Sequence, residues 1–194
     1  RENASAAFLA DSRCMHFLYD RRIFVCPIPK WKRRRMMSEW THFDENGNAR
    51  MVDVTGKEPT FRTAAAVGSL LVSEEVLSAI EGHAIKKGDV LTVAQVAGIM
   101  AVKQTAHLIP MCHPLLTQNC AVTFELKKEP SPRVTARCTV KLEGKTGVEM
   151  EALTGVSVAL LTVYDMCKAL DKRMVMTDIH LEEKTGGKSG DFRF

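Results

Sequence analysis

An apolar run of helix length with charge at both ends is the feature of this sequence that most constrains its fold. The run covers residues 145–168 and reads KTGVEMEALTGVSVALLTVYDMCK. Apolar side chains recur in it at helical spacing and predict a well-buried helix: Leu153, Val156, Leu160, Val163 and Tyr164. Unpaired buried charge is costly, so the charged residues at the two ends need an explanation.

The charged residues form one pair at each end of the run. If Glu149, Met150 and Glu151 are extended, alternation places both carboxylates on one face. Asp165 and Lys168, three residues apart, share a face near the end of the helix. Such a pair is also common on surface helices, where it stabilises by about 0.2–0.5 kcal/mol, so spacing alone leaves a structural role open.

Length and composition favour a single domain. A chain of 194 residues with 45% hydrophobic content can bury one core. Charged or polar residues interrupt every apolar run, which predicts no membrane span. The six cysteines form no CxxC and no zinc-finger spacing, so we expect reduced thiols, no protein-held metal and a cytoplasmic location.

The positive net charge of +4 belongs to the beginning of the chain. Residues 1–40 contain nine Arg and Lys against four Asp and Glu, whereas the rest contains eighteen against nineteen. The domain is therefore not predicted to bind nucleic acid. We interpret 1–36 as an extension of unknown role, with a basic targeting arm as the alternative, and 37–194 as the domain.

Periodicity and turn signals predict the order β-β-α-α-β-β-α-β. Strands are expected at 51–54, 64–72, 117–128, 133–143 and 178–184. A short helix capped by Ser73 and a longer one over 90–107 capped by Asp89 precede the long helix described above. This order indicates an α+β fold in which helices back an antiparallel sheet. Gly98 lies in a stripe of small residues and indicates that another helix approaches closely.

Three further segments are candidates for a functional site. Two prolines stiffen the loop that carries Cys112 and His113, which could be a nucleophile and base, a ligand pair or packed side chains. Lys87 precedes a helix N-terminus, where anions are favoured, although a surface lysine is the simpler interpretation. The GGKSG tail lacks the spacing of a phosphate-binding P-loop; Lys184 and Lys188 could still reach an anion, or the tail could be solvated.

These segments together resemble one family. LIPMCHPL, KTGVEMEALT, VYDMCKA, KKGDV and KTGGKSGDF, with MVDV at 51–54, are similar to the molybdenum cofactor biosynthesis C proteins, the cyclic pyranopterin monophosphate synthases. The resemblance covers 41–194 and leaves out 1–36. It implies a ferredoxin-like α+β fold and a homohexamer, a trimer of dimers with active sites at dimer interfaces.

The resemblance also implies the reaction and its participants. The family converts 3′,8-cyclo-7,8-dihydro-GTP, made by a radical-SAM partner enzyme, to cyclic pyranopterin monophosphate and pyrophosphate, which makes it a lyase. No cofactor is certain, although Mg²⁺ could accompany the triphosphate. On this basis the catalytic candidates are Asp165, Lys168, His113 and Lys87. The substrate-binding candidates are Arg62, Met111, Cys112, His113, Glu149, Met150 and Glu151, with Cys112 lining the pocket and Lys184 and Lys188 as further cations.

Two rival functions remain to be tested. One is a purine-nucleotide-binding module or scaffold for the radical-SAM partner, without turnover. The other is a lyase or cyclase that acts on ordinary GTP. A binding module has no need for so many acids and bases in one chain, which favours the synthase.

Overall fold

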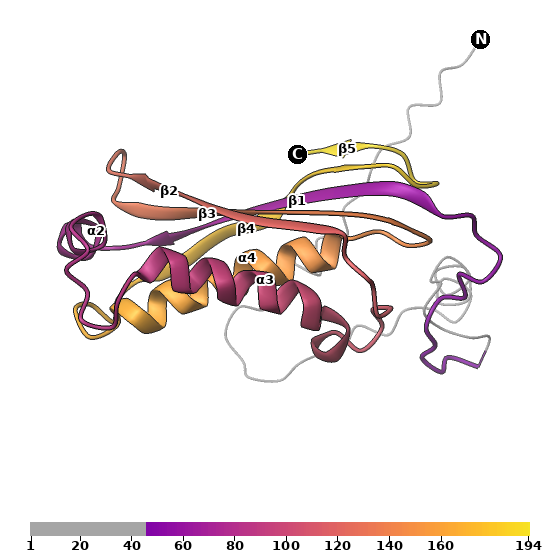
Figure 1. The fold of residues 1–194 in the computed structure, drawn as a ribbon, viewed down its shortest axis with the longest axis horizontal. Coiled ribbons are helices and arrows are strands. Elements are labelled where there is room, and N and C mark those ends of the chain that lie inside the picture. The colour runs from indigo at the N-terminus through magenta and orange to yellow at the C-terminus, as the bar shows by residue number, and fades with distance from the viewer. Residues whose placement is uncertain (1–45) are drawn as a thin grey trace, which may run out of the picture. The chain divides into compact units, whose positions relative to one another are not determined.

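A five-stranded antiparallel sheet with helices on one face forms the domain. The computed structural model describes residues 46–194, and the predicted boundary between residues 36 and 37 lies outside that part. Along the chain, the elements are β1 (Thr60–Leu71), α2 (Glu74–Glu81), α3 (Val90–Leu108), β2 (Asn119–Lys127), β3 (Arg133–Gly144), α4 (Glu149–Cys167), β4 (Val175–Thr185) and β5 (Phe192–Arg193). The two long helices, α3 and α4, lie side by side against the sheet (Figure 1).

The order of the strands identifies the topology. In space they follow one another as β2-β3-β1-β4-β5, and every neighbouring pair is antiparallel. Without β5, this is the split β-α-β-β-α-β arrangement of ferredoxin-like folds, with α2 and α3 together forming the first connection. The predicted α+β, ferredoxin-like class is therefore confirmed.

The core lies between the sheet and the two long helices. Small side chains on β1 make this possible, since Ala64 and Ala66 are fully buried and Gly68 lies against Leu160 of α4. The inner stripe of α4 is buried against them, as its periodicity predicts. Both helices are apolar beyond their buried stripes, and α3 leaves Met100 60% exposed.

The stripe of small residues on α3 does approach another helix closely. A side chain at Gly98 would meet the carbonyl oxygen of Gly155 at 3.0 Å and Cβ of Ala159 at 3.2 Å. A side chain at Gly155 would meet Sγ of Cys138 at 2.6 Å, across on the sheet. Glycine at these two positions therefore lets α3, α4 and β3 pack at close range.

The predicted elements differ from the structure in four places. β1 begins at Thr60, four residues before the predicted start of that strand. Residues 51–54 form no strand, although their alternation predicts one. The last strand begins at Val175, three residues before the predicted start, and is followed by the unpredicted two-residue strand β5. Glu149 already belongs to α4, so the segment 149–151 is helical and not extended.

By length and composition α4 could cross a membrane, which corrects the prediction that every apolar run is too interrupted. Its mean hydropathy is 1.3, but 56% of it is buried inside the domain. Burial of this kind is expected of a core helix, so the hydropathy of α4 is weak evidence for a membrane.

The close packing at Gly155 leads to a prediction. Replacing a helical glycine by alanine ordinarily adds about 1 kcal/mol of stability. In Gly155→Ala, the new methyl would overlap Cys138 and Val102, both buried, so we expect a net loss of about 1–3 kcal/mol in the free energy of unfolding. Urea denaturation would measure it, and a variant as stable as the wild type would contradict the packing described.

Candidate active site

The predicted site residues divide between the two ends of α4. The helix has 19 residues, and each adds about 1.5 Å, so Glu149 and Asp165 lie about 24 Å apart along its axis. We call the group formed by Lys87, Asp165 and Lys168 the Asp165 cluster. We call the group around the start of α4, which includes Glu149, Glu151 and Lys184, the Glu149 cluster.

In the Asp165 cluster, two lysines hold one carboxylate. Lys168 Nζ lies 2.6 Å from Oδ1 of Asp165, one helical turn away. Lys87 Nζ donates to Oδ2 at 3.1 Å and to the backbone carbonyl of Asp165 at 2.8 Å. Lys87 comes from the loop before α3, whose first turn is capped by Asp89 through the backbone N–H of Thr92. The capped loop thus places Lys87 against the end of α4.

The charges in this cluster are mutually stabilised and still open to solvent. The hydrogen bond from Lys168, followed by that from Lys87, lowers the pKa of Asp165 below its usual value. The hydrogen bond and the negative charge of Asp165 in turn raise the pKa of Lys168, and desolvation opposes this only weakly. With half of its side chain exposed, Lys168 therefore keeps its positive charge.

At the other end of α4, Glu149 makes a half-buried ion pair with β4. Its Oε1 lies 2.9 Å from Nζ of Lys184, whose side chain is only 19% exposed. Lys184 also donates to Oγ of Ser189 at 2.7 Å. Lys184 is therefore folded into the cluster, which excludes the solvated-tail interpretation for this residue, whereas Lys188 is exposed.

Because α4 begins at Glu149, the two glutamates do not share a face. Residues two apart on a helix point in nearly opposite directions, and only Glu151 turns inward, where it is 3% exposed. Met150, between them, remains 37% exposed. The expectation of two carboxylates on one face is therefore wrong, and the two acids have different environments.

Burial makes Glu151 an unusual carboxyl group. Loss of water raises its pKa above the ordinary 4.5, and the nearby charge of Glu149 raises it further. Burial, followed by the charge of Glu151, also raises the pKa of the Cys112 thiol. Cys112 therefore remains protonated, which agrees with lining the pocket better than with acting as a nucleophile.

His113 is tied to a segment far away in the sequence. Its Nε2 lies 2.8 Å from the carbonyl oxygen of Val52, in the stretch predicted to be a strand. Lys145 Nζ donates to the carbonyl of Thr55 in the same stretch, also at 2.8 Å. Met111 lies next to Cys112 in the same loop and is half-buried.

Arg62 lies at the start of β1, where the glycine-rich tail passes over it. Its Nε donates to the carbonyl of Gly144 at 3.0 Å. Gly187 has a positive φ of 86°, in the left-handed region. A side chain there would overlap the guanidinium of Arg62. The tail is thus a folded cover for Arg62, and its glycines permit that contact.

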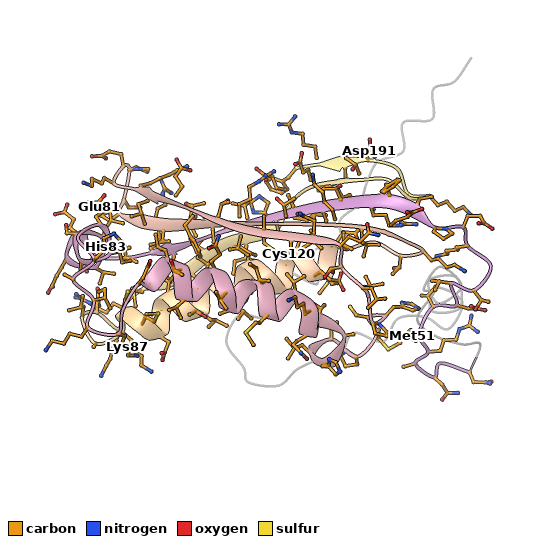
Figure 2. The ribbon with its side chains drawn as sticks, in the orientation of Figure 1. Met51, Glu81, His83, Lys87, Cys120 and Asp191 are labelled. Atoms are coloured by element: carbon orange, nitrogen blue, oxygen red, sulfur yellow. The ribbon has the colours of Figure 1, made fainter. Side chains whose placement is uncertain are left out.

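Sequence reasoning missed Lys145 and the segment that it holds. Lys145 stands inside KTGVEMEALT, but its partner is a backbone carbonyl 90 residues earlier, for which the sequence carries no signal. The sequence also gave no indication of which candidate residues lie at the same end of the domain. Lys87 and Met51 lie at opposite ends (Figure 2). Within 46–194, no group of three His, Cys, Asp or Glu side chains is placed to hold a metal ion.

Comparison with known proteins decides the family. The profile of the MoaC family matches residues 51–187. The chain belongs to the MoaC family. The match begins at Met51, in the segment that contacts His113, and ends at Gly187, which covers Arg62. Both clusters therefore lie within the part of the chain that the MoaC family shares.

Individual MoaC relatives agree along almost their whole length. A protein from Nocardioides sp. is 60% identical over 152 residues, which are 78% of this chain and 93% of that protein. One from Geobacillus thermodenitrificans is 56% identical over 158 residues, 81% of this chain and 98% of its own. One from Clostridium perfringens strain SM101 is 57% identical over 160 residues, 82% of this chain and 100% of its own. All three are named cyclic pyranopterin monophosphate synthase.

The raised pKa of Glu151 predicts how stability depends on pH. A carboxyl group with a raised pKa binds its proton more tightly in the folded state, so it destabilises the fold progressively as pH rises from about 4.5 through its folded pKa. We expect Glu151→Gln, which cannot ionise, to have a higher free energy of unfolding than the wild type at pH 7.

Urea titrations of both proteins from pH 4 to 8 would measure this difference. The gap should be small near pH 4 and widen as pH rises. Glu149→Gln is the matched control, because Glu149 is paired with Lys184 and its loss should not stabilise the fold at pH 7. A Glu151→Gln variant that is less stable at pH 7 would contradict the cost assigned to the buried charge.

Proposed function

We propose that this chain is a cyclic pyranopterin monophosphate synthase, a lyase of molybdenum cofactor biosynthesis. It would convert 3′,8-cyclo-7,8-dihydro-GTP to cyclic pyranopterin monophosphate and release pyrophosphate. The observation that carries the proposal is the match to relatives of that name over 93–100% of their length, at 56–60% identity. The geometry supports it, since Lys87, Asp165 and Lys168 form one cluster of candidate residues and Glu149 and Lys184 are paired in the other.

The chemistry gives each cluster a separate task. Rebuilding a purine into a pterin requires several proton transfers, and each needs a group within about 2.6–3.2 Å of the reacting atom. Burial raises the pKa of Glu151 above its ordinary value, which makes it a carboxyl group suited to accept and return a proton. Asp165 and Lys168 offer a carboxylate and an ammonium group on one face, and His113 offers an imidazole.

The cations would bind the triphosphate and the departing pyrophosphate. Lys87 and Arg62 are the first candidates, and Lys184 and Lys188 follow. Lys87 and Lys168 together carry more charge than Asp165 neutralises, so the Asp165 cluster retains a net positive charge for an anion. Mg²⁺, where it takes part, would arrive with the triphosphate.

The distance between the clusters leads us to propose that two protomers share each active site. Groups about 24 Å apart along α4 cannot all contact one reacting ring system. An isologous dimer could bring the Asp165 cluster of one protomer to the Glu149 cluster of its partner and form two equal sites. The predicted homohexamer, a trimer of such dimers, would contain six.

Two features of the protomer support this assembly. The outer face of α3 exposes Val93, Val96 and Met100, which would bury favourably against another subunit. Asp165 and Lys168 are half exposed, and a subunit or substrate that covers them would strengthen their interactions with developing charge. The radical-SAM partner enzyme would supply the substrate in the cytoplasm.

The reaction itself is the first prediction of this proposal. In a single-turnover incubation with the cyclised dihydro-GTP, the wild type should form cyclic pyranopterin monophosphate and pyrophosphate in equal amounts. Lys168→Ala should lower the rate by about 10²–10³-fold, as expected when a positive charge that stabilises the transition state is lost. Mass analysis and a pyrophosphate assay would follow the products.

Two controls separate this reaction from the rival functions. GTP alone should remain unchanged; its conversion would indicate a different lyase or cyclase. Tight binding of the cyclised nucleotide without product, in wild type and variant alike, would refute the enzyme and leave a nucleotide-binding module or scaffold.

Shared sites lead to a complementation prediction. Asp165→Ala and His113→Ala should each be inactive, because each removes one half of every site. Denatured, mixed in equal amounts and refolded together, they should regain about a quarter of wild-type activity, since an isologous mixed dimer contains one intact site. Equal mixing without refolding is the control, and no gain after confirmed subunit exchange would show that each site lies within one protomer.

A further inference from the structure

Residues 50–57, which we call the strap, run as an irregular segment and not as the predicted strand. Two side chains from distant loops fasten it. His113 contacts the carbonyl of Val52 and Lys145 donates to the carbonyl of Thr55, each at 2.8 Å. Both side chains belong to loops that border the Glu149 cluster: one carries Cys112, and the other leads into α4.

The strap is folded so that it presents carbonyl groups. Oδ1 of Asp53 accepts the backbone N–H of Thr55 at 2.8 Å, and the backbone N–H of Lys57 donates to Val54 at 3.1 Å. These two bonds turn the chain locally and use its own N–H groups. The carbonyls of Val52 and Thr55 remain to accept hydrogen bonds from outside the strap.

The contact with Val52 determines which nitrogen of His113 carries hydrogen. A backbone carbonyl can only accept, so Nε2 of His113 must be the donor in this bond. In the neutral imidazole the second nitrogen, Nδ1, then holds the free lone pair. The strap therefore selects one tautomer and turns Nδ1 away from Val52.

We propose that the strap is a positioning element of the active site, which orients His113 so that its Nδ1 exchanges protons with the substrate. This inference rests on the proposed function. A proton taken from the substrate forms the Nδ1–H bond and leaves its electron pair on the substrate, while Nε2–H continues to donate to Val52. Returning that proton restores the same tautomer, so the ring need not rotate during turnover.

Lys145 has the supporting role in this arrangement. Its hydrogen bond to Thr55 holds the far end of the strap to the loop before Glu149, and its charge also lowers the pKa of Asp53 in the strap. Loss of that hydrogen bond should loosen the strap without removing any group that touches the substrate. Lys145 is thus a positioning residue, and its effect should differ from that of His113.

Variants at His113 separate the two nitrogens. The amide nitrogen of glutamine lies near the position of Nε2 and can still donate to Val52, whereas that of asparagine lies nearer Nδ1. We expect His113→Gln to keep amide hydrogen exchange of residues 51–57 within about threefold of wild type and to lower kcat by about 10²–10⁴-fold. His113→Asn should lower kcat similarly and speed exchange by about 3- to 10-fold.

Lys145 provides the complementary test. Lys145→Met should speed exchange of the strap and raise KM by about 3- to 10-fold, with kcat reduced less than in either His113 variant. Lys141→Met, an exposed lysine on the neighbouring strand β3, is the matched control and should change neither quantity.

The outcomes distinguish this proposal from the function on which it rests. Exchange is measured on the full chain without substrate, so it reports on the strap even if wild type forms no product, an outcome that would refute the function alone. Full activity in His113→Gln would overturn the role of Nδ1. Unchanged strap exchange in both His113→Asn and Lys145→Met would overturn the positioning role of the strap.

Discussion

Burial of one face of α4 against β1 is the constraint on which the rest of the structure depends. Ala64, Ala66 and Gly68 make that face of the sheet shallow enough for the helix to approach, and Gly155 admits α3 and β3 on the other sides. Close packing along the helix leaves it little room to move relative to the sheet. Its two ends therefore carry their charged groups at a set separation, and neither end can reach the other by bending.

Much of the fold was predictable because its signals are local. The strands β2 and β3 and the helices α2 and α3 follow from period and capping, as with Ser73 and Asp89, whereas β1 was predicted to begin four residues too late. The start of α4 was misjudged because its N-cap, Val148, makes no side-chain capping bond, so the sequence contains no start signal there. The segment 51–54 was wrongly predicted to be a strand because MVDV alternates. In the structure, carbonyl groups of the strap bond to the side chains of His113 and Lys145 and not to a neighbouring strand.

The sequence predicted correctly that some candidate residues lie close together, but it did not predict how the candidate residues are arranged as a whole. Asp165, Lys168 and Lys87 were expected together and lie together, since one helical turn and a capped loop suffice to place them. The different environments of Glu149 and Glu151 depend on where the helix begins, and the separation of the two clusters depends on tertiary packing. Neither the environments nor the separation can be derived from the spacing of residues along a sequence. The geometry therefore adds a condition to the roles that family resemblance implies, because one protomer alone does not bring the two clusters together.

The length of α4 sets the distance between the charged groups at its two ends. Each residue added to or removed from the helix interior would shift Asp165 by about 1.5 Å and rotate it by about 100° relative to Glu149. Substitutions can be absorbed along the exposed side of the helix, but in the proposed dimer a change in its length would misalign both shared sites at once. In that assembly the number of residues between Glu149 and Asp165 would constrain the active site as strictly as the identity of the two groups does.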